Sequence, residues 1–246
     1  PAVFDTDDAN ASLYTAAVYT NGSKLGINPY FTGGKSGGDY NAISYANPLA
    51  EINLGLLRNA KKLEFVVKDT STQQEYFKWS EDDVRKTYYS ANYGQIIPYY
   101  LANFNNEITI WDGKNNGSAL PDGTKATYEI RAYLDDGDDV VDDIYQFDVT
   151  IDNQKPQITN ANNLASELKK ENGKLLLPID LKDNHRIAAL MFVNSEGVTM
   201  GKYEVENQPG VEYKNTYDVS GYGSDFTIVV ADYAMNETEL TVSLDL

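Results

Sequence analysis

Short runs of alternating apolar and polar residues, broken by Gly, Asn and Asp, dominate this sequence. In the run 145–151 every second side chain from Tyr145 to Ile151 is apolar, and the run 127–134 alternates in the same way. A period of two places successive side chains on opposite faces of a strand. Turn residues separate such runs at intervals of roughly 8–12 positions, which is typical of antiparallel sandwiches. The pattern therefore predicts an all-β chain.

A break in this pattern predicts two domains. The segment 152–158 is mostly polar, and Pro156 fixes its own φ and favours extended geometry at the residue before it. A polar segment with a Pro between two strands is typical of a domain boundary. We therefore expect two tandem fibronectin- or immunoglobulin-like antiparallel sandwiches, over residues 1–153 and 154–246. The first contains a long insertion near 75–106.

Helix signals are few. Ser80 is followed three residues later by Asp83, which resembles the start of a capped helix and predicts a turn or two there. The segment 162–170 predicts another short helical turn. Neither changes the all-β expectation.

The composition excludes several kinds of site and partner. The 246 residues include no Cys and one His, and the formal net charge is −17. Without Cys the chain has no disulfide, thiolate nucleophile, zinc-thiolate site or iron–sulfur cluster. A strongly negative field repels phosphate backbones, so we expect no nucleic-acid partner. No apolar run approaches the roughly 20 residues that span a bilayer, and no signal peptide precedes Pro1, so we expect a mature product or a fragment.

The densest group of carboxylates predicts a calcium site. Six of the nine residues in 135–143 are Asp, and Asp135, Asp136, Asp138 and Asp139 are the candidate ligands. Calcium takes six to eight oxygen ligands, which a flexible acidic loop can supply. The spacing is not that of an EF-hand loop. The alternative interpretation is a solvated hairpin tip whose charges keep the protein soluble.

A second group of polar residues lies in the second half of the chain. Asp183 follows one predicted strand and Asp232 ends another, so both can lie at one pole of the second sandwich, with Asn184, His185 and Asn236 beside them. The alternative is turn chemistry, in which Asp and Asn side chains bind nearby backbone N–H groups. No nucleophile motif accompanies the one imidazole, so we expect an exposed or capping His and no catalytic residue.

A Tyr-rich segment lies inside the expected insertion. Tyr88, Tyr89, Tyr93, Tyr99 and Tyr100 fall within a short stretch around Gly94 and Pro98. Exposed Tyr rings can form a binding platform for carbohydrate or protein. The alternative is structural, because Tyr is also a strong strand former.

An ordered series of motifs resembles a known protein family. In chain order the motifs are Gly-Gly-Asp-Tyr (37–40), Leu-Arg-Asn-Ala-Lys-Lys-Leu (57–63), Trp-Asp-Gly (111–113), Leu-Pro-Asp-Gly-Thr (120–124), Tyr-Glu-Ile-Arg-Ala-Tyr (128–133), Phe-Asp-Val-Thr-Ile-Asp-Asn-Gln-Lys-Pro (147–156) and Ile-Val-Val-Ala-Asp-Tyr-Ala-Met-Asn-Glu (228–237). This order is similar to that of the fibronectin type III-like accessory domains of subtilisin-like cell-envelope serine proteinases, the group of lactocepins and complement-cleaving surface peptidases. The resemblance covers about residues 25–240.

The resemblance implies a non-catalytic region of a secreted protease at the bacterial cell wall, with the catalytic triad elsewhere in the parent chain. Its partners would be the parent's catalytic domain and a protein substrate or cell-wall polymer. Two other functions stay open. An adhesin or carbohydrate-binding module of a bacterial surface protein should show a planar row of exposed rings. A stand-alone enzyme such as a glycosidase needs a concave pocket with converging carboxylates.

Overall fold

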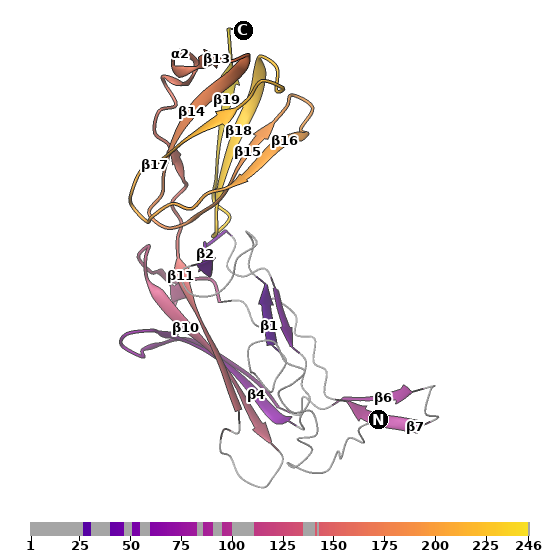
Figure 1. The fold of residues 1–246 in the computed structure, drawn as a ribbon. Coiled ribbons are helices and arrows are strands. Elements are labelled where there is room, and N and C mark those ends of the chain that lie inside the picture. The colour runs from indigo at the N-terminus through magenta and orange to yellow at the C-terminus, as the bar shows by residue number, and fades with distance from the viewer. Residues whose placement is uncertain are drawn as a thin grey trace. The chain divides into compact units, whose positions relative to one another are not determined.

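The protein is built almost entirely of β-strands, as the alternating pattern predicts. The computed structural model describes residues 27–30, 40–46, 51–54, 60–82, 86–90, 95–99, 111–134, 141 and 143–245. In this part of the chain the strands form several antiparallel sheets, and the one helix, α2 (Leu164–Glu167), is a single turn (Figure 1). The all-β prediction is confirmed, and a short helical turn occurs within 162–170 as expected.

The chain folds into two compact units. The first comprises Pro1–Phe31 and Pro48–Val149, and the second comprises Thr32–Asn47 and Thr150–Leu246. The division falls inside strand β11 (Asp143–Ile151), a few residues before the boundary expected from the polar segment. An earlier stretch of chain also belongs to the second unit, which the sequence did not indicate.

The first unit is centred on one sheet. Its strands are β1 (Ile27–Tyr30), β3 (Glu51–Leu54), β4 (Ala60–Asp69), β5 (Glu75–Asp82), β6 (Lys86–Ser90), β7 (Gln95–Tyr99), β8 (Lys114–Asn115), β9 (Ser118–Ala119), β10 (Lys125–Leu134) and most of β11. Strand β4 pairs antiparallel with β5 and with β10, and β11 is the next neighbour of β10. The helical turn expected to begin at Ser80 is wrong, because residues 80–82 continue β5, where Trp79 lies opposite Phe65 of β4.

One face of this sheet holds an aromatic core. Phe65 and Tyr128 are buried on the same face, where Tyr128 stacks on Phe147 with 5.0 Å between ring centroids. Trp111, which is 1% exposed, stacks on Tyr76 and meets Tyr128 edge-on. Stacked and edge-on rings of this kind add packing energy beyond the area that they bury.

The opposite face carries buried charges that are fully paired. Glu64 is 3% exposed and receives ion pairs from Lys62 and Lys78, together with a hydrogen bond from the Tyr133 hydroxyl. Burial alone would raise the pKa of Glu64, but these donors outweigh it and lower the pKa to about 2. This carboxylate therefore stays ionised and is part of the structure of the sheet.

The second unit is a two-sheet sandwich. Its elements are β2 (Ala42–Ile43), β12 (Gln157–Ile158), α2, β13 (Lys169–Glu171), β14 (Lys174–Lys182), β15 (Ile187–Val193), β16 (Thr199–Glu204), β17 (Tyr213–Asp218), β18 (Asp225–Asp232) and β19 (Glu237–Ser243). One sheet has the order β12-β14-β13 with β17 also paired to β14, and the other has the order β16-β15-β18-β19. Figure 1 shows the two sheets packed face to face.

Local sequence explains the elements of this sandwich. In β14 the side chains of Leu177, Ile179 and Leu181 are fully buried and alternate with more exposed neighbours, as a half-buried strand requires. Asn172 and Gly173 join β13 to β14 and both have positive φ, the geometry of a two-residue type I′ hairpin turn. The inward faces of both sheets meet in one continuous hydrophobic core.

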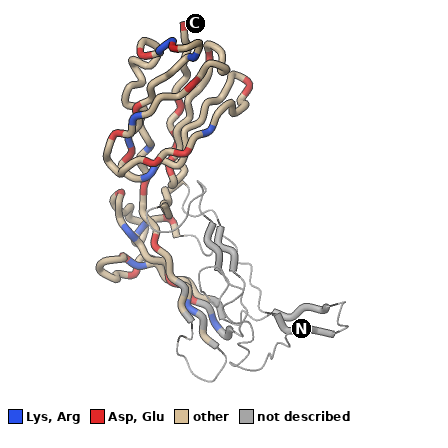
Figure 2. The backbone as a smooth tube through the Cα atoms, viewed as in Figure 1, with Lys and Arg blue, Asp and Glu red and all other residues tan. Residues whose placement is uncertain are grey.

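Acidic residues occur throughout both units and do not form a tail. Figure 2 shows Asp and Glu along most of the described backbone, with Lys and Arg interspersed. The negative charge is therefore a property of the whole surface, and buried carboxylates need individual explanation.

Candidate metal centre

Three buried carboxylates meet in the second unit. Asp152 follows β11, Asp183 follows β14 and Asp232 ends β18, so each lies at the end of a strand. Their exposed fractions are 1%, 3% and 1%. One carboxylate oxygen from each residue lies within 4.8 Å of those from the other two.

The topology of the sandwich brings two of these residues together. The chain leaves β14 at Asp183 and turns into β15, whose first residue, Ile187, pairs with Asp232 of β18. Asp183 and Asp232 therefore flank the same crossover between the two sheets, although 49 positions separate them in the sequence (232 − 183).

The third carboxylate, Asp152, lies in the segment that follows β11 in the second unit. Asp152 N donates to Ile43 O of β2 at 2.9 Å, beside the short parallel pairing of β2 with β11. Two Asn side chains of the sandwich hold it from the other side. Asn184 Nδ2 donates to Asp152 Oδ1 at 2.8 Å, and Asn236 Nδ2 donates to Asp152 O at 3.0 Å.

Asp232 organises the last hairpin of the sandwich. Its Oδ1 accepts from Asn236 N and its Oδ2 from Asn236 Nδ2, both at 2.8 Å. These bonds close the turn between β18 and β19, in which Met235 has a φ of 65°. The turn chemistry expected for Asp232 and Asn236 is therefore present, and it places the carboxylate beside the other two.

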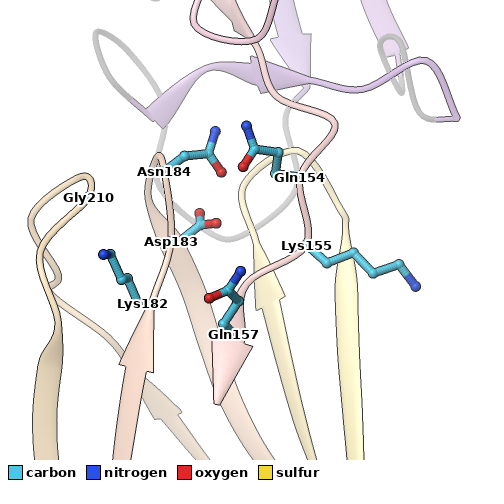
Figure 3. Close-up of a pocket in the computed structure, with 7 residues that line it drawn as sticks. All are labelled: Gln154, Lys155, Gln157, Lys182, Asp183, Asn184 and Gly210. Carbon is cyan, nitrogen blue, oxygen red and sulfur yellow. The ribbon is translucent and has the colours of Figure 1, made fainter. Parts of the chain in front are cut away.

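Asp183 is the least satisfied member of the group. Its Oδ2 accepts one long hydrogen bond, 3.4 Å, from His185 N. Its Oδ1 is buried and has no hydrogen-bond partner. Figure 3 shows the Asp183 side chain at the end of β14, near the side chains of Asn184 and Gln154. A buried carboxylate oxygen without a donor costs free energy that some other interaction must offset.

The electrostatics of the group disfavour three bare negative charges. Burial is the main cause that raises the pKa of Asp183 to about 7, and the charge of Asp152 adds to it. Burial likewise raises the pKa of Asp232 to about 8 against the opposing hydrogen bonds from Asn236. In the part of the chain that the structure describes, neither Asp183 nor Asp232 forms an ion pair with Lys or Arg. The site therefore attracts positive charge, as a proton or as a metal ion.

A shallow pocket opens onto the same group. It has a volume of about 260 Å³, and Gln154, Lys155, Gln157, Lys182 and Asn184 line it together with Asp183 and Gly210 (Figure 3). The pocket therefore borders the Asp183 side of the cluster.

The residues predicted from sequence have different outcomes. Asp183, Asn184, His185, Asp232 and Asn236 do lie together around one pole of the second sandwich. His185 is buried, at 7% exposed, so of the two expectations for this residue, exposed or capping, the exposed one is wrong. Its backbone N–H donates to Asp183, and its carbonyl accepts from Asn207 Nδ2.

The other predicted site residues fall largely outside the described part of the chain. The structure does not describe Asp135, Asp136, Asp138 and Asp139, so their role as calcium ligands stays a prediction. In the Tyr-rich segment the structure describes only backbone, a hairpin of β6 and β7, so its role as a binding surface also stays a prediction. Asp152 was not singled out as a ligand. It directly follows a strand, as Asp183 does, but its place beside the other two depends on the long-range pairing of β11 with β2.

Comparison with known proteins adds no assignment. No family model matches the chain, and no curated protein matches it. Within the described residues no helix has the length and apolar character to cross a membrane. The family resemblance therefore depends on the ordered motifs and on the roles of their residues in the fold.

Proposed function

We propose that this chain is a non-catalytic accessory region of a secreted, cell-wall-associated subtilisin-like serine protease. In this role the two all-β units space or brace the catalytic domain of the parent protein, or contact its substrate, outside the bacterial cell. The observation that carries the proposal is that residues of several motifs of the resemblance build core and turns of the fold.

The Trp-Asp-Gly motif builds the core and a turn of the first unit. Trp111 fills the core, and its Nε1 donates to Lys114 O at 2.8 Å. Asp112 Oδ1 accepts from Lys114 N, and Gly113 has a φ of 77° that only Gly adopts without strain. All three residues thus serve one loop of the fold.

The later motifs have the same character. In the Leu-Pro-Asp-Gly-Thr motif both the N and the Oγ1 of Thr124 donate to Pro121 O, and Gly123 has a φ of 84°. In the last motif Asp232 and Asn236 close the β18–β19 turn. Hydrogen-bonded turns of this kind stabilise the fold, which suits the scaffold role that the resemblance implies.

The aromatic residues favour this proposal over an adhesin or carbohydrate-binding module. A binding platform needs exposed rings in a row. Of the aromatic residues whose side chains the structure describes, each is buried or half-buried; of the two Trp residues, Trp111 is 1% exposed and Trp79 is half-buried. The surface that these residues offer is therefore unsuited to stacking on a sugar.

Two observations test the proposal. The coding sequence upstream of Pro1 should encode a subtilisin-type catalytic domain, and an upstream region of any other class would contradict the assignment. The purified chain should leave casein intact over a long incubation at neutral pH. Cleavage that a serine-protease inhibitor abolishes would show that the chain is itself an enzyme.

A further inference from the structure

We propose that the second unit binds one calcium ion between Asp152, Asp183 and Asp232, and that the ion fastens the segment carrying Asp152 to the sandwich. This inference goes beyond the accessory role and is independent of the identity of the parent protein.

The separation of the carboxylate oxygens fits a single calcium ion. Calcium binds oxygen at roughly 2.3–2.6 Å, so two oxygens on one ion are separated by at most roughly 4.6–5.2 Å. The three oxygens, which lie within 4.8 Å of one another, satisfy this condition. The three side chains, which come from three separate strand ends, already lie close enough to bind one ion without a large backbone movement.

The unsatisfied oxygen of Asp183 indicates that a ligand belongs in the cluster. Asp183 is 97% buried (100% − 3%), and its Oδ1 has no hydrogen-bond partner. A protein does not gain stability from a carboxylate held in this state, because the desolvation is not repaid by a bond. A cation among the three oxygens would give Asp183 Oδ1 a partner. Its attraction for each carboxylate would also offset the repulsion between Asp183 and the other two.

The donor set selects a hard cation with little need for bound water. All three side chains offer oxygen, and the chain has no Cys with which to build a zinc-thiolate site. Magnesium keeps several waters and near-ideal octahedral geometry, whereas calcium accepts irregular sites. Three carboxylates buried to more than 95% suit the less hydrated and more adaptable ion.

Binding at this place would connect two parts of the second unit. Two backbone hydrogen bonds join the segment that carries Asp152 to β2 and the residue before it. Thr150 N donates to Asn41 O, and Asp152 N donates to Ile43 O, both at 2.9 Å. This ladder is short, and β2 itself has two residues. The other two ligands end β14 and β18, which are in the two different sheets of the sandwich. One ion would therefore tie the segment to both sheets at once.

The first experiment is a calcium titration of the full chain after chelator treatment. Differential scanning calorimetry follows the unfolding of both units. Tryptophan fluorescence would not report on the second unit, because both Trp residues, Trp79 and Trp111, lie in the first. At a free calcium concentration of about 100 times the Kd, the unfolding temperature of the second unit should rise by about 10 °C. Isothermal titration with calcium chloride should detect one site that Asp232→Asn removes.

Matched variants separate this site from other acidic groups. Asp225→Asn changes an exposed carboxylate at the opposite end of β18 and should keep the full thermal gain. Asp138→Asn/Asp139→Asn alters the acidic loop and should also keep it. Far-UV circular dichroism confirms that each variant is folded. Retention of the gain in Asp232→Asn, its loss in the acidic-loop variant, or no gain in the wild type would overturn the proposal, and so would an equal gain with magnesium.

The fastening of the segment has its own readout. Hydrogen exchange of peptides covering 40–46 and 150–154 should slow at least tenfold when calcium is added, because the ion adds a link through Asp152. Peptides from β17, remote in sequence from all three ligands, should change less. Calcium binding without slower exchange in the segment would refute the fastening and leave a site that only fills a cavity.

Discussion

Asp183→Asn should make the calcium-free protein more stable at pH 8, although it alters a buried residue. The substitution keeps the size of the side chain and removes a charge that the structure leaves without a pairing base. Burial, and then the charge of Asp152, raises the pKa of Asp183 to about 7. Because the folded-state pKa lies above the unfolded value, the folded protein holds more protons in the intervening pH range. Its stability therefore falls as the pH rises from about 4 to about 7.

The magnitude follows from the difference in pKa. A pKa of about 7 against an unfolded value of roughly 3.9 corresponds to about 4 kcal/mol of destabilisation at pH 8 as an upper limit. Asp152 and Asp232 share the charge of the cluster and relax when one member is neutral, so we expect a net gain of about 1–2 kcal/mol. At pH 5, about one unit above the unfolded pKa of roughly 3.9, only about a third of this destabilisation is present, so the gain from the substitution should be about a third of that at pH 8.

Urea unfolding in EDTA at pH 5 and pH 8, followed by circular dichroism, measures this difference. Asp225→Asn is the control, because hydroxyl donors from Ser224 and Ser243 lower the pKa of Asp225 and its removal should act in the opposite direction. With saturating calcium the order should invert, and Asp183→Asn should be less stable than the wild type. Destabilisation by Asp183→Asn in EDTA at pH 8, or an equal gain at both pH values, would refute the electrostatic reasoning.

Three further substitutions test the packing of the second unit. In Gly201→Ala the new Cβ would lie 2.2 Å from the Tyr222 hydroxyl oxygen, so we expect a loss of roughly 1–3 kcal/mol in urea unfolding; a neutral result would show that the ring moves freely. Asn207→Ala removes the acceptor of the buried Ile187 N–H and the donor to His185 O. It should lower the free energy of unfolding by about 2–4 kcal/mol in the same assay. A loss of less than about 1 kcal/mol would show that water replaces the lost side chain. Met235→Gly should be neutral or stabilise by up to about 1 kcal/mol, because Met235 is exposed and its φ is 65°; a clear loss would mean that its side chain has a packing role.

Strand patterns in the sequence were sufficient to predict two long strands closely. The alternating runs 127–134 and 145–151 correspond to β10 and β11. The error at Ser80 has a physical cause, since a capping-box spacing is local whereas the pairing of β5 with β4 is set by distant residues.

The candidate site was predicted in part. Asp183 and Asp232 were expected at one pole because each ends a strand, and this is the arrangement in the fold. Asp152 could not be added from the pattern, because its position depends on β2, an element of two residues with no periodicity. Its burial depends on long-range pairing and on Asn184 and Asn236, which sequence spacing does not reveal.

A crystal structure of the chain grown with calcium tests the central claim most directly. The account predicts one strong anomalous peak in the second unit, with an oxygen of Asp152, of Asp183 and of Asp232 each at roughly 2.3–2.6 Å. A well-ordered cluster with no peak among these three carboxylates, in crystals grown at millimolar calcium, would contradict it.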